Sequence, residues 1–220
     1  MRAMLPTLLV ILTVAVLYWF PLRRWFGRWG TTSEDRTRVM TGDAVIVNPT
    51  HSATHAVTVD APPDDIWPWL VQMGYQRGGL YSYDWLDRLF GILDRPSANR
   101  VLPEFQHLAV GDKILLGPPA RGEELTVTAL EPFRALVLSY RAQGFEWVWQ
   151  FGLYPLGNNR TRLVTRGTER VPNTAGGWLF MRVMEPAAFV MTRRMLLGLK
   201  QRAETLKARA SARASDTRNN

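Results

Sequence analysis

Three side chains in the middle of the chain are of the types that acid and base catalysis uses. Tyr81, Tyr83 and His107 lie in or beside a stretch of weak periodicity, among several carboxylate, amide and guanidinium side chains. Buried tyrosine and histidine can donate and accept protons near neutral pH when their surroundings adjust their pKa values. The alternative is that these groups only tie down an irregular loop by hydrogen bonds. They are candidate catalytic residues, and both interpretations stay open.

Other kinds of reactive site are poorly represented. The chain has no cysteine, which excludes thiolate nucleophiles, thiolate metal sites and disulfides. His51 and His55 lead into an expected strand rather than sharing a helix, so the histidines give no convergent metal-ligand pattern. Ser82, Asp94 and His107 have the residue types of a hydrolase triad, but Ser82 lies in Tyr-Ser-Tyr rather than in a nucleophile elbow. No phosphate-binding loop or dinucleotide fingerprint occurs, so we expect neither a metal nor a cofactor.

The net charge of +8 is concentrated at the two ends of the chain. Residues 1–40 hold six basic and two acidic side chains, and residues 192–220 hold eight basic and two acidic ones. The intervening residues 41–191 hold 13 basic and 15 acidic side chains, so the body of the chain is close to neutral. A nucleic-acid-binding domain carries its basic stripe on the folded body. We therefore expect no nucleic-acid partner.

An apolar segment near the N-terminus has the length of a membrane-spanning helix. Residues 3–22 are consecutive and uncharged, and at ~1.5 Å per residue they would span about 30 Å. No small-residue cleavage site follows, which favours an uncleaved anchor over a signal peptide. Arg23, Arg24 and Arg28 come next, so the positive-inside bias places the rest of the chain in the cytoplasm. We predict a single-pass transmembrane anchor with a basic juxtamembrane segment over 1–29, then a linker over 30–53.

The elements that must position the candidate residues begin with a strand and two short helices. Residues 54–60 alternate as a half-buried strand does. A helix then opens near Pro63, because proline suits a first helical turn and the two aspartates that follow suit its positive end. A second helical piece is expected over 83–90, and 91–111 is expected to be an ordered loop.

A run of strand signals follows, at 112–116, 124–130, 134–141, 145–154 and 160–171, and the short connections predict an antiparallel sheet. In the fourth of these strands one face is strongly apolar: Phe145, Trp147, Trp149, Phe151 and Leu153. In the fifth strand one face is basic: Arg160, Arg162, Arg166 and Arg170. A slip of one residue would put arginines opposite tryptophans. The predicted register therefore pairs Glu146 with Arg170, Gln150 with Arg166, Tyr154 with Arg162 and Trp149 with Gly167, and leaves the arginine row as a paired, solvated sheet face.

The chain is expected to end in a long helix and a loose tail. Over 185–208 the apolar residues recur every three to four positions, as in a helix that packs on a sheet. Residues 209–220 are mostly Ala, Ser, Arg and Asn and lack that periodicity, which predicts a disordered basic tail. Basic side chains there could be drawn to anionic lipid headgroups.

This order of elements resembles the helix-grip fold of the START and polyketide-cyclase-like superfamily, often labelled SRPBCC. Residues 57–74 are similar to the family's opening strand and helix, with an Ala-Pro turn at 61–62 and Ile-Trp at 66–67. The segments 78–87, 103–108, 110–112 and 185–191 resemble an uncharacterised bacterial branch, which we expect to be membrane-anchored. The resemblance covers about residues 54–208.

The resemblance implies an α+β domain in which a curved antiparallel sheet wraps around the long C-terminal helix over an apolar cavity. Hydrophobic small molecules, such as lipids and polyketides, would be the ligands, and no catalytic motif is transferred. The leading hypothesis is a membrane-anchored protein that binds a hydrophobic small molecule or lipid without covalent chemistry. One alternative is a cyclase, aromatase or dehydratase that uses Tyr81, Tyr83 and His107, and another is a protein-interaction module with a filled core. The predicted cavity lining, for which a packed core is the alternative, is Trp69, Met73, Tyr81, Tyr83, Trp85, His107, Trp147, Trp149, Phe151, Met195 and Leu199.

Overall fold

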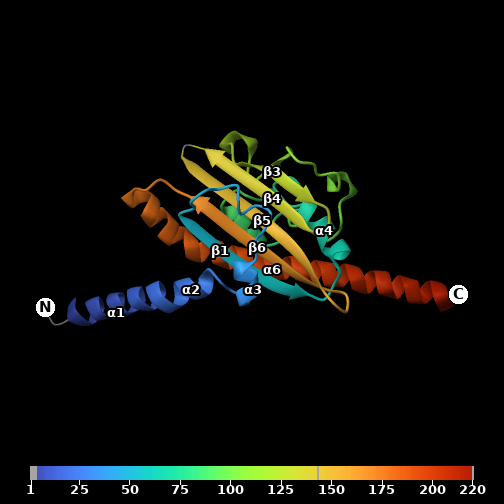
Figure 1. Ribbon diagram of the computed structural model, residues 1–220, viewed down its shortest axis with the longest axis horizontal. Helices are drawn as coiled ribbons and strands as arrows, with labels where there is room; N and C mark the ends of the chain where they lie inside the picture. The colour runs from blue at the N-terminus through green and yellow to red at the C-terminus, as the bar shows by residue number, and fades with distance from the viewer. Residues whose placement is uncertain (1–3, 143, 220) are drawn as a thin grey trace.

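The computed structural model describes residues 4–142 and 144–219. It is an α+β fold with a curved six-stranded antiparallel sheet and a long C-terminal helix, α6 (Ala175–Asn219), which runs along one side of the sheet (Figure 1). The strands follow the order β1-β6-β5-β4-β3-β2 across the sheet. Their bounds are β1 His51–Val59, β2 Lys113–Leu115, β3 Glu124–Glu131, β4 Ala135–Ala142, β5 Phe145–Leu156 and β6 Arg160–Arg170.

Short helices fill the connections between these strands. α4 (Pro63–Val71) and α5 (Asp84–Leu89) follow β1, and the 3-10 turns η2 (Pro103–Phe105) and η3 (Pro119–Arg121) flank β2. α4 begins as its sequence predicts, with proline in the first turn and two aspartates at its positive end. α6 packs against α4 and β1, so the helix and the sheet enclose the main core. This is the helix-grip arrangement predicted from the order of elements.

The inner face of the sheet, which faces α6, carries the main apolar core. Phe151 and Leu163 from the sheet, Leu70 from α4, and Leu196 and Leu199 from α6 are almost completely buried in one cluster. Trp147 and Trp149 lie on the same face but are only partly buried against this cluster. The predicted face assignment is confirmed, and the inner face is densely packed near α4 and less covered near the tryptophans.

The predicted register between β5 and β6 is confirmed throughout. The strand pairs are Glu146 with Arg170, Gln150 with Arg166, Tyr154 with Arg162 and Trp149 with Gly167. A three-residue loop, 157–159, joins the two strands, as expected. The side-chain alternation in these strands was sufficient to predict the register, because a slip of one residue would exchange the buried and exposed faces.

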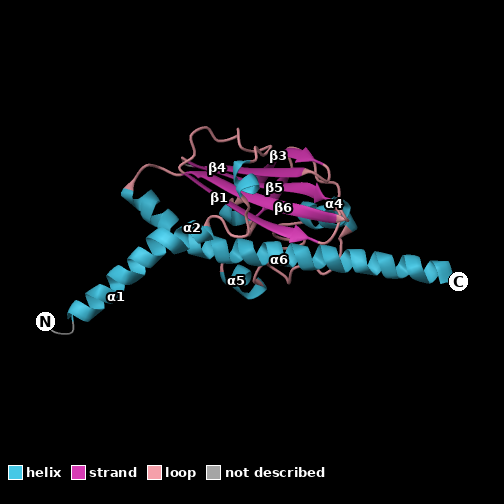
Figure 2. Cartoon of the chain, turned by 60° about the horizontal axis from the view of Figure 1, so that its bottom comes forward, coloured by secondary structure: helices cyan, strands magenta, loops and turns pink. Residues whose placement is uncertain are grey.

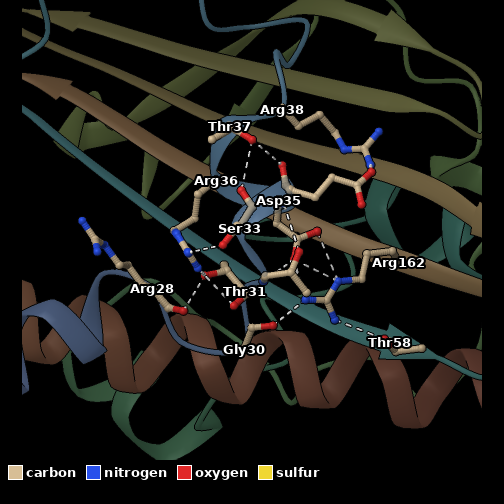
Figure 3. Close-up of polar contacts among 12 residues, drawn as sticks. Arg28, Gly30, Thr31, Ser33, Asp35, Arg36, Thr37, Arg38, Thr58 and Arg162 are labelled. Atoms are coloured by element: carbon tan, nitrogen blue, oxygen red, sulfur yellow. Dashed lines mark hydrogen bonds and ion pairs between the residues drawn. The ribbon is translucent and has the colours of Figure 1, made fainter.

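The arginine row on the outer face is paired, but its middle is not solvated as predicted. Residues 30–50, expected to be a linker, pack over it and contain the short helix α3 (Ser33–Thr37). Arg162 pairs with Asp35 at 2.6 Å and Arg166 pairs with Asp43 at 2.6 Å, and the two arginine side chains are 14% and 9% exposed. Figure 3 shows Asp35 and Arg162 pointing toward one another beneath α3. Ion pairs formed with a distant segment leave no periodic signal, so the alternation of β6 could not predict this cover.

The predicted membrane-spanning helix is divided into three pieces. α1 covers Met4–Leu17, a π-helical turn, η1, covers Tyr18–Leu22, and α2 covers Arg23–Phe26. Pro21 lies in the π-helical turn, where its missing N–H and its ring interrupt regular α-helical hydrogen bonding. Among the described residues, no helix combines the length and the apolar character that crossing a bilayer requires. The expectation of one uninterrupted helix over 3–22 is corrected accordingly.

The C-terminal helix is longer at both ends than the predicted 185–208. It begins at Ala175, although Gly176 and Gly177 have low helix propensity, and it contains Pro186 in its interior. It continues to Asn219 through the residues whose composition predicted disorder. Alanine and arginine favour helix, and this propensity extends the helix without an apolar stripe.

Candidate functional site

Six of the predicted cavity residues form a packed core. They are at most 3% exposed: Trp69, Met73, Tyr81, Phe151, Met195 and Leu199. Trp69 and Tyr81 pack edge to face with their ring centroids 6.0 Å apart. These side chains fill the space between the sheet, α4 and α6. They form a packed core, which was the alternative to a cavity lining.

Tyr81 is held as a structural residue. Its hydroxyl donates a hydrogen bond to the Trp69 carbonyl oxygen at 3.1 Å, and its backbone N–H donates to Ser97 Oγ at 3.2 Å. The Arg202 guanidinium lies 4.6 Å from the centre of its ring. Burial raises the pKa of the Tyr81 hydroxyl, so this group stays protonated at neutral pH.

The other residues predicted from the irregular segment do not join Tyr81. Tyr83 is half-buried, with the Arg194 guanidinium 5.7 Å from its ring centre. Trp85 is 66% exposed and His107 is exposed. Asp84 accepts two hydrogen bonds from Ser97, at 2.7 and 3.0 Å, which secures the loop to the start of α5. The hydrogen bonds between Asp84 and Ser97 thus hold the irregular loop in place, as the alternative to a catalytic role expects.

A different polar cluster lies where the inner face is less covered. Its centre is Glu185 of α6, whose side chain is 6% exposed. Arg23 Nε donates to Glu185 Oε2 at 2.9 Å, and Tyr18 donates from its hydroxyl to the same oxygen at 3.3 Å. Arg182 also pairs with this carboxylate. Burial alone would raise the pKa of Glu185, but the hydrogen bonds from Arg23 and Arg182 outweigh burial and lower it, so Glu185 is ionised.

Two histidines of β1 line the same region. His51 places Nδ1 3.5 Å from Glu185 Oε1, and His55 places Nε2 2.6 Å from the Phe26 carbonyl oxygen. Burial lowers the pKa of His51 more than the Glu185 carboxylate raises it. Burial also lowers the pKa of His55, against a smaller opposing effect of its hydrogen bond to Phe26. Both imidazoles are therefore neutral at pH 7.

Glu169 is the cluster's unsatisfied member. It is paired with His51 across the β1–β6 ladder and with Trp147 across the β5–β6 ladder. A Cβ added at Gly167 would lie 3.3 Å from Glu169 Oε1 and 3.7 Å from Trp147 Nε1, so both groups overlie that glycine. Glu169 Oε2 is buried and has no hydrogen-bond partner among the described residues. Burial, followed by the charge of Glu185, raises the pKa of Glu169 to about 8, so the carboxyl is protonated at neutral pH.

The arrangement offers a neutral carboxylic acid and a neutral imidazole beside an apolar aromatic surface. Trp147 and Trp149 stack with their centroids 5.6 Å apart and their planes 16° apart. A protonated carboxyl can donate a hydrogen bond to a carbonyl oxygen in such surroundings. No group of metal-ligating side chains suited to an ion is found within 4–142 and 144–219. The inner polar cluster, defined as His51, Glu169, Glu185, Arg23 and Arg182, is the candidate functional site.

The sequence contained one usable signal for this site. The predicted alternation of β6 places Leu163, Thr165 and Gly167 on the inner face, and the next residue on that face is Glu169. An acidic residue on an apolar face is either paired or functional. Its neighbours could not be predicted, because Arg23 and Glu185 meet across 162 positions of sequence. His51 was considered only as a metal ligand.

No protein-family model matches the sequence, and neither does any curated protein. Solved structures do match in shape. Protein MLL2253 from Mesorhizobium loti is 17% identical, with 70% of this chain and 98% of that chain covered and a TM-score of 0.40. The conserved protein of unknown function EF2215 from Enterococcus faecalis is 14% identical, with 76% of this chain and 88% of that chain covered and a TM-score of 0.43. CalU16 from Micromonospora echinospora is 18% identical, with 71% of this chain and 86% of that chain covered and a TM-score of 0.34. The likeness is partial, so the helix-grip assignment rests on strand order, antiparallel pairing and the position of α6.

Proposed function

We propose that this protein binds a hydrophobic small molecule with a carbonyl or similar acceptor group at the inner polar cluster. The apolar part of the ligand would lie against Trp147 and Trp149, and its acceptor would take a hydrogen bond from protonated Glu169. The observation that carries the proposal is the buried Glu169 Oε2, which no described residue satisfies. Buried polar groups are nearly always hydrogen-bonded, so an unsatisfied carboxyl beside half-buried aromatic rings indicates a ligand contact.

The proposal agrees with the hydrophobic-ligand hypothesis from sequence but moves its polar contact. Tyr81 already donates its hydroxyl proton to a backbone carbonyl, and His107 is exposed. Membership of the SRPBCC superfamily is proposed on the same basis, namely the strand order and the helix that packs on the inner face. Attachment to a membrane by 1–29, with the domain on the cytoplasmic side, stays a prediction.

Binding of an apolar fluorescent ketone, 6-propionyl-2-dimethylaminonaphthalene, tests the proposal. The emission of this ketone reports both an apolar surrounding and a hydrogen bond to its carbonyl. The wild type should bind it saturably, and Glu169→Leu should weaken binding about tenfold, since one buried hydrogen bond contributes about 1.4 kcal/mol. Glu124→Gln, at an exposed position on β3, is the control.

Three results are informative. Equal affinity in the wild type and Glu169→Leu would refute the role of Glu169. No saturable binding by the wild type would favour the interaction module with a filled core. Affinity that falls as the pH rises through about 8, in the wild type alone, would support donation from a protonated Glu169.

A second candidate function, proton transfer, has one specific observation in its favour. His51 and Glu169 occupy opposed positions of neighbouring strands, and burial lowers the pKa of His51 while it raises the pKa of Glu169. Glu169 could donate its proton to a carbonyl oxygen while His51 removes a proton from the adjacent carbon, which gives an enol and reverses. NMR detection of deuterium exchange at that carbon of the bound ketone tests this. Exchange in the wild type that is lost in His51→Gln would establish an enzyme, and unchanged exchange in that variant would exclude the base.

A further inference from the structure

Two helical segments far apart in sequence project together from one end of the molecule. The first consists of α1, η1 and α2, and the second is the first part of α6, residues 175–184. They meet where Tyr18 donates to the Arg182 carbonyl at 2.8 Å and Arg23 donates to Glu185 at 2.9 Å. From this junction they diverge away from the sheet (Figures 1 and 2). We call residues 4–26 and 175–184 the apolar fork.

Both branches of the fork expose large apolar side chains. Each of the following is between 41% and 65% exposed: Leu9, Val10, Val14, Val16, Leu22 and Trp25 on the first branch, and Trp178, Leu179, Phe180, Val183 and Met184 on the second. Soluble monomers rarely expose large apolar patches, and such patches mark contacts with proteins or membranes. The second branch was not foreseen from sequence, where the helix was expected to begin at Glu185.

The charge of the fork is of one sign. Neither residues 1–33 nor residues 175–184 contain an aspartate or a glutamate. The basic side chains near the junction are Arg23, Arg24, Arg28 and Arg182. Arg23 and Arg182 pair with Glu185 at the junction, and Arg24 and Arg28 are exposed. Exposed apolar surface bordered by these arginines complements the headgroup and acyl layers of an anionic bilayer. A symmetric second copy would instead bring each set of arginines toward its own duplicate.

We propose that the apolar fork docks on an anionic lipid bilayer, with both branches in contact with lipid. The new element is the start of α6, which adds a second membrane contact to the predicted N-terminal one. The junction of the branches is also where Glu185, a member of the inner polar cluster, accepts a hydrogen bond from Arg23, so docking would turn that site toward the lipid. The docking surface shares Arg23 and Arg182 with the inner polar cluster but does not include Glu169, so the proposal would hold whether or not Glu169 binds a ligand.

The absence of cysteine allows a direct test on the full chain. Val183 on the second branch, Val14 on the first, and Val110 in the loop before β2, the edge strand farthest from β1, are 65%, 60% and 61% exposed. Val183→Cys, Val14→Cys and Val110→Cys would each be labelled with a nitrobenzoxadiazole fluorophore, whose emission rises in an apolar surrounding. The chains would be mixed with vesicles of phosphatidylcholine with or without phosphatidylglycerol, and with vesicles that contain a spin-labelled lipid as quencher.

We expect the labels at 183 and 14 to brighten at least twofold with anionic vesicles and to be quenched by spin-labelled lipid. The label at 110 should keep its water-like emission. Brightening at 14 without brightening at 183 would overturn the proposal, since the second branch would then lie outside the lipid. Brightening at 183 that depends on protein concentration, and not on vesicles, would also overturn it and would assign the fork to a second copy of the chain.

Discussion

Buried carboxyl groups occur on both faces of this sheet, and the two faces differ in how these groups are hydrogen-bonded. On the outer face, Asp35 and Asp43 each receive hydrogen bonds from a buried arginine, and Gln150 donates to Asp43 at 2.7 Å. On the inner face, Glu185 is satisfied in the same way, but Glu169 beside it is not. The ion pairs of Asp35 and Asp43 fix residues 30–50 to the outer face of the sheet. Incomplete pairing on the inner face identifies the place where a ligand group is expected.

The largest expected effect is loss of the outer pairing. Asp35→Ala should lower the free energy of unfolding by about 3–5 kcal/mol, because Arg162 would stay buried without its carboxylate. Asp35 also caps α3, where it forms reciprocal hydrogen bonds with Thr32. Burial alone would raise the pKa of Asp35, but the hydrogen bonds from Arg162 and Thr32 lower it, so the ionised form is the one that the fold uses.

The matched control for Asp35→Ala lies in the same short helix. Glu34 has a side chain that is 77% exposed, and Glu34→Ala should change stability by about 0.5 kcal/mol or less. Urea unfolding followed by tryptophan fluorescence measures both variants. Similar losses for the two would mean that the outer ion pair does not hold the segment, and the comparison between the faces would fail.

On the inner face we expect a gain in the free energy of unfolding, the opposite sign to Asp35→Ala and smaller for each pH unit. The pKa of Glu169 is raised by burial and by Glu185 from 4.5 in the unfolded chain to about 8. The folded state therefore holds a proton that the unfolded state has lost, and stability falls as the pH rises from about 4.5 to about 8. Glu169→Gln removes this proton, so it should gain stability relative to the wild type by about 1 kcal/mol per pH unit in that window.

The difference between variant and wild type is the quantity to measure. His51 and His55, whose pKa values are lowered mainly by burial, make stability rise with pH up to about 6.5, which partly hides the contribution of Glu169 in the wild type alone. Urea midpoints at pH 5, 6, 7 and 8 give the difference. A difference that stays constant with pH would show that Glu169 is ionised in the fold and satisfied by a partner.

The same comparison explains what could be predicted from sequence. The register of β5 and β6 followed from alternation, because Trp149 and Arg166 can occupy only opposite faces. The outer cover and the inner cluster could not be predicted, because each depends on side chains that meet across more than a hundred positions, as in Arg162 with Asp35. The start of α6 was missed since Gly176 and Gly177 disfavour helix locally, and tertiary contacts at Arg182 and Glu185 override that preference.

The smallest expected effect separates the packed end of the inner face from the site. Tyr81→Phe keeps the ring, its edge-to-face contact with Trp69 and its contact with Arg202, and removes the hydroxyl, which donates to the Trp69 carbonyl and lies beside the Gln72 side chain. The free energy of unfolding should fall by about 1 kcal/mol, the usual contribution of one such bond. His107→Ala, at an exposed position, should change the free energy of unfolding by about 0.5 kcal/mol or less.

Neither variant should change the affinity for the naphthyl ketone by more than about twofold, since a twofold change corresponds to about 0.4 kcal/mol. Tyr81→Phe that binds the ketone tenfold more weakly while its stability is unchanged would move the site to the α4 end of the sheet and restore Tyr81 as its polar group.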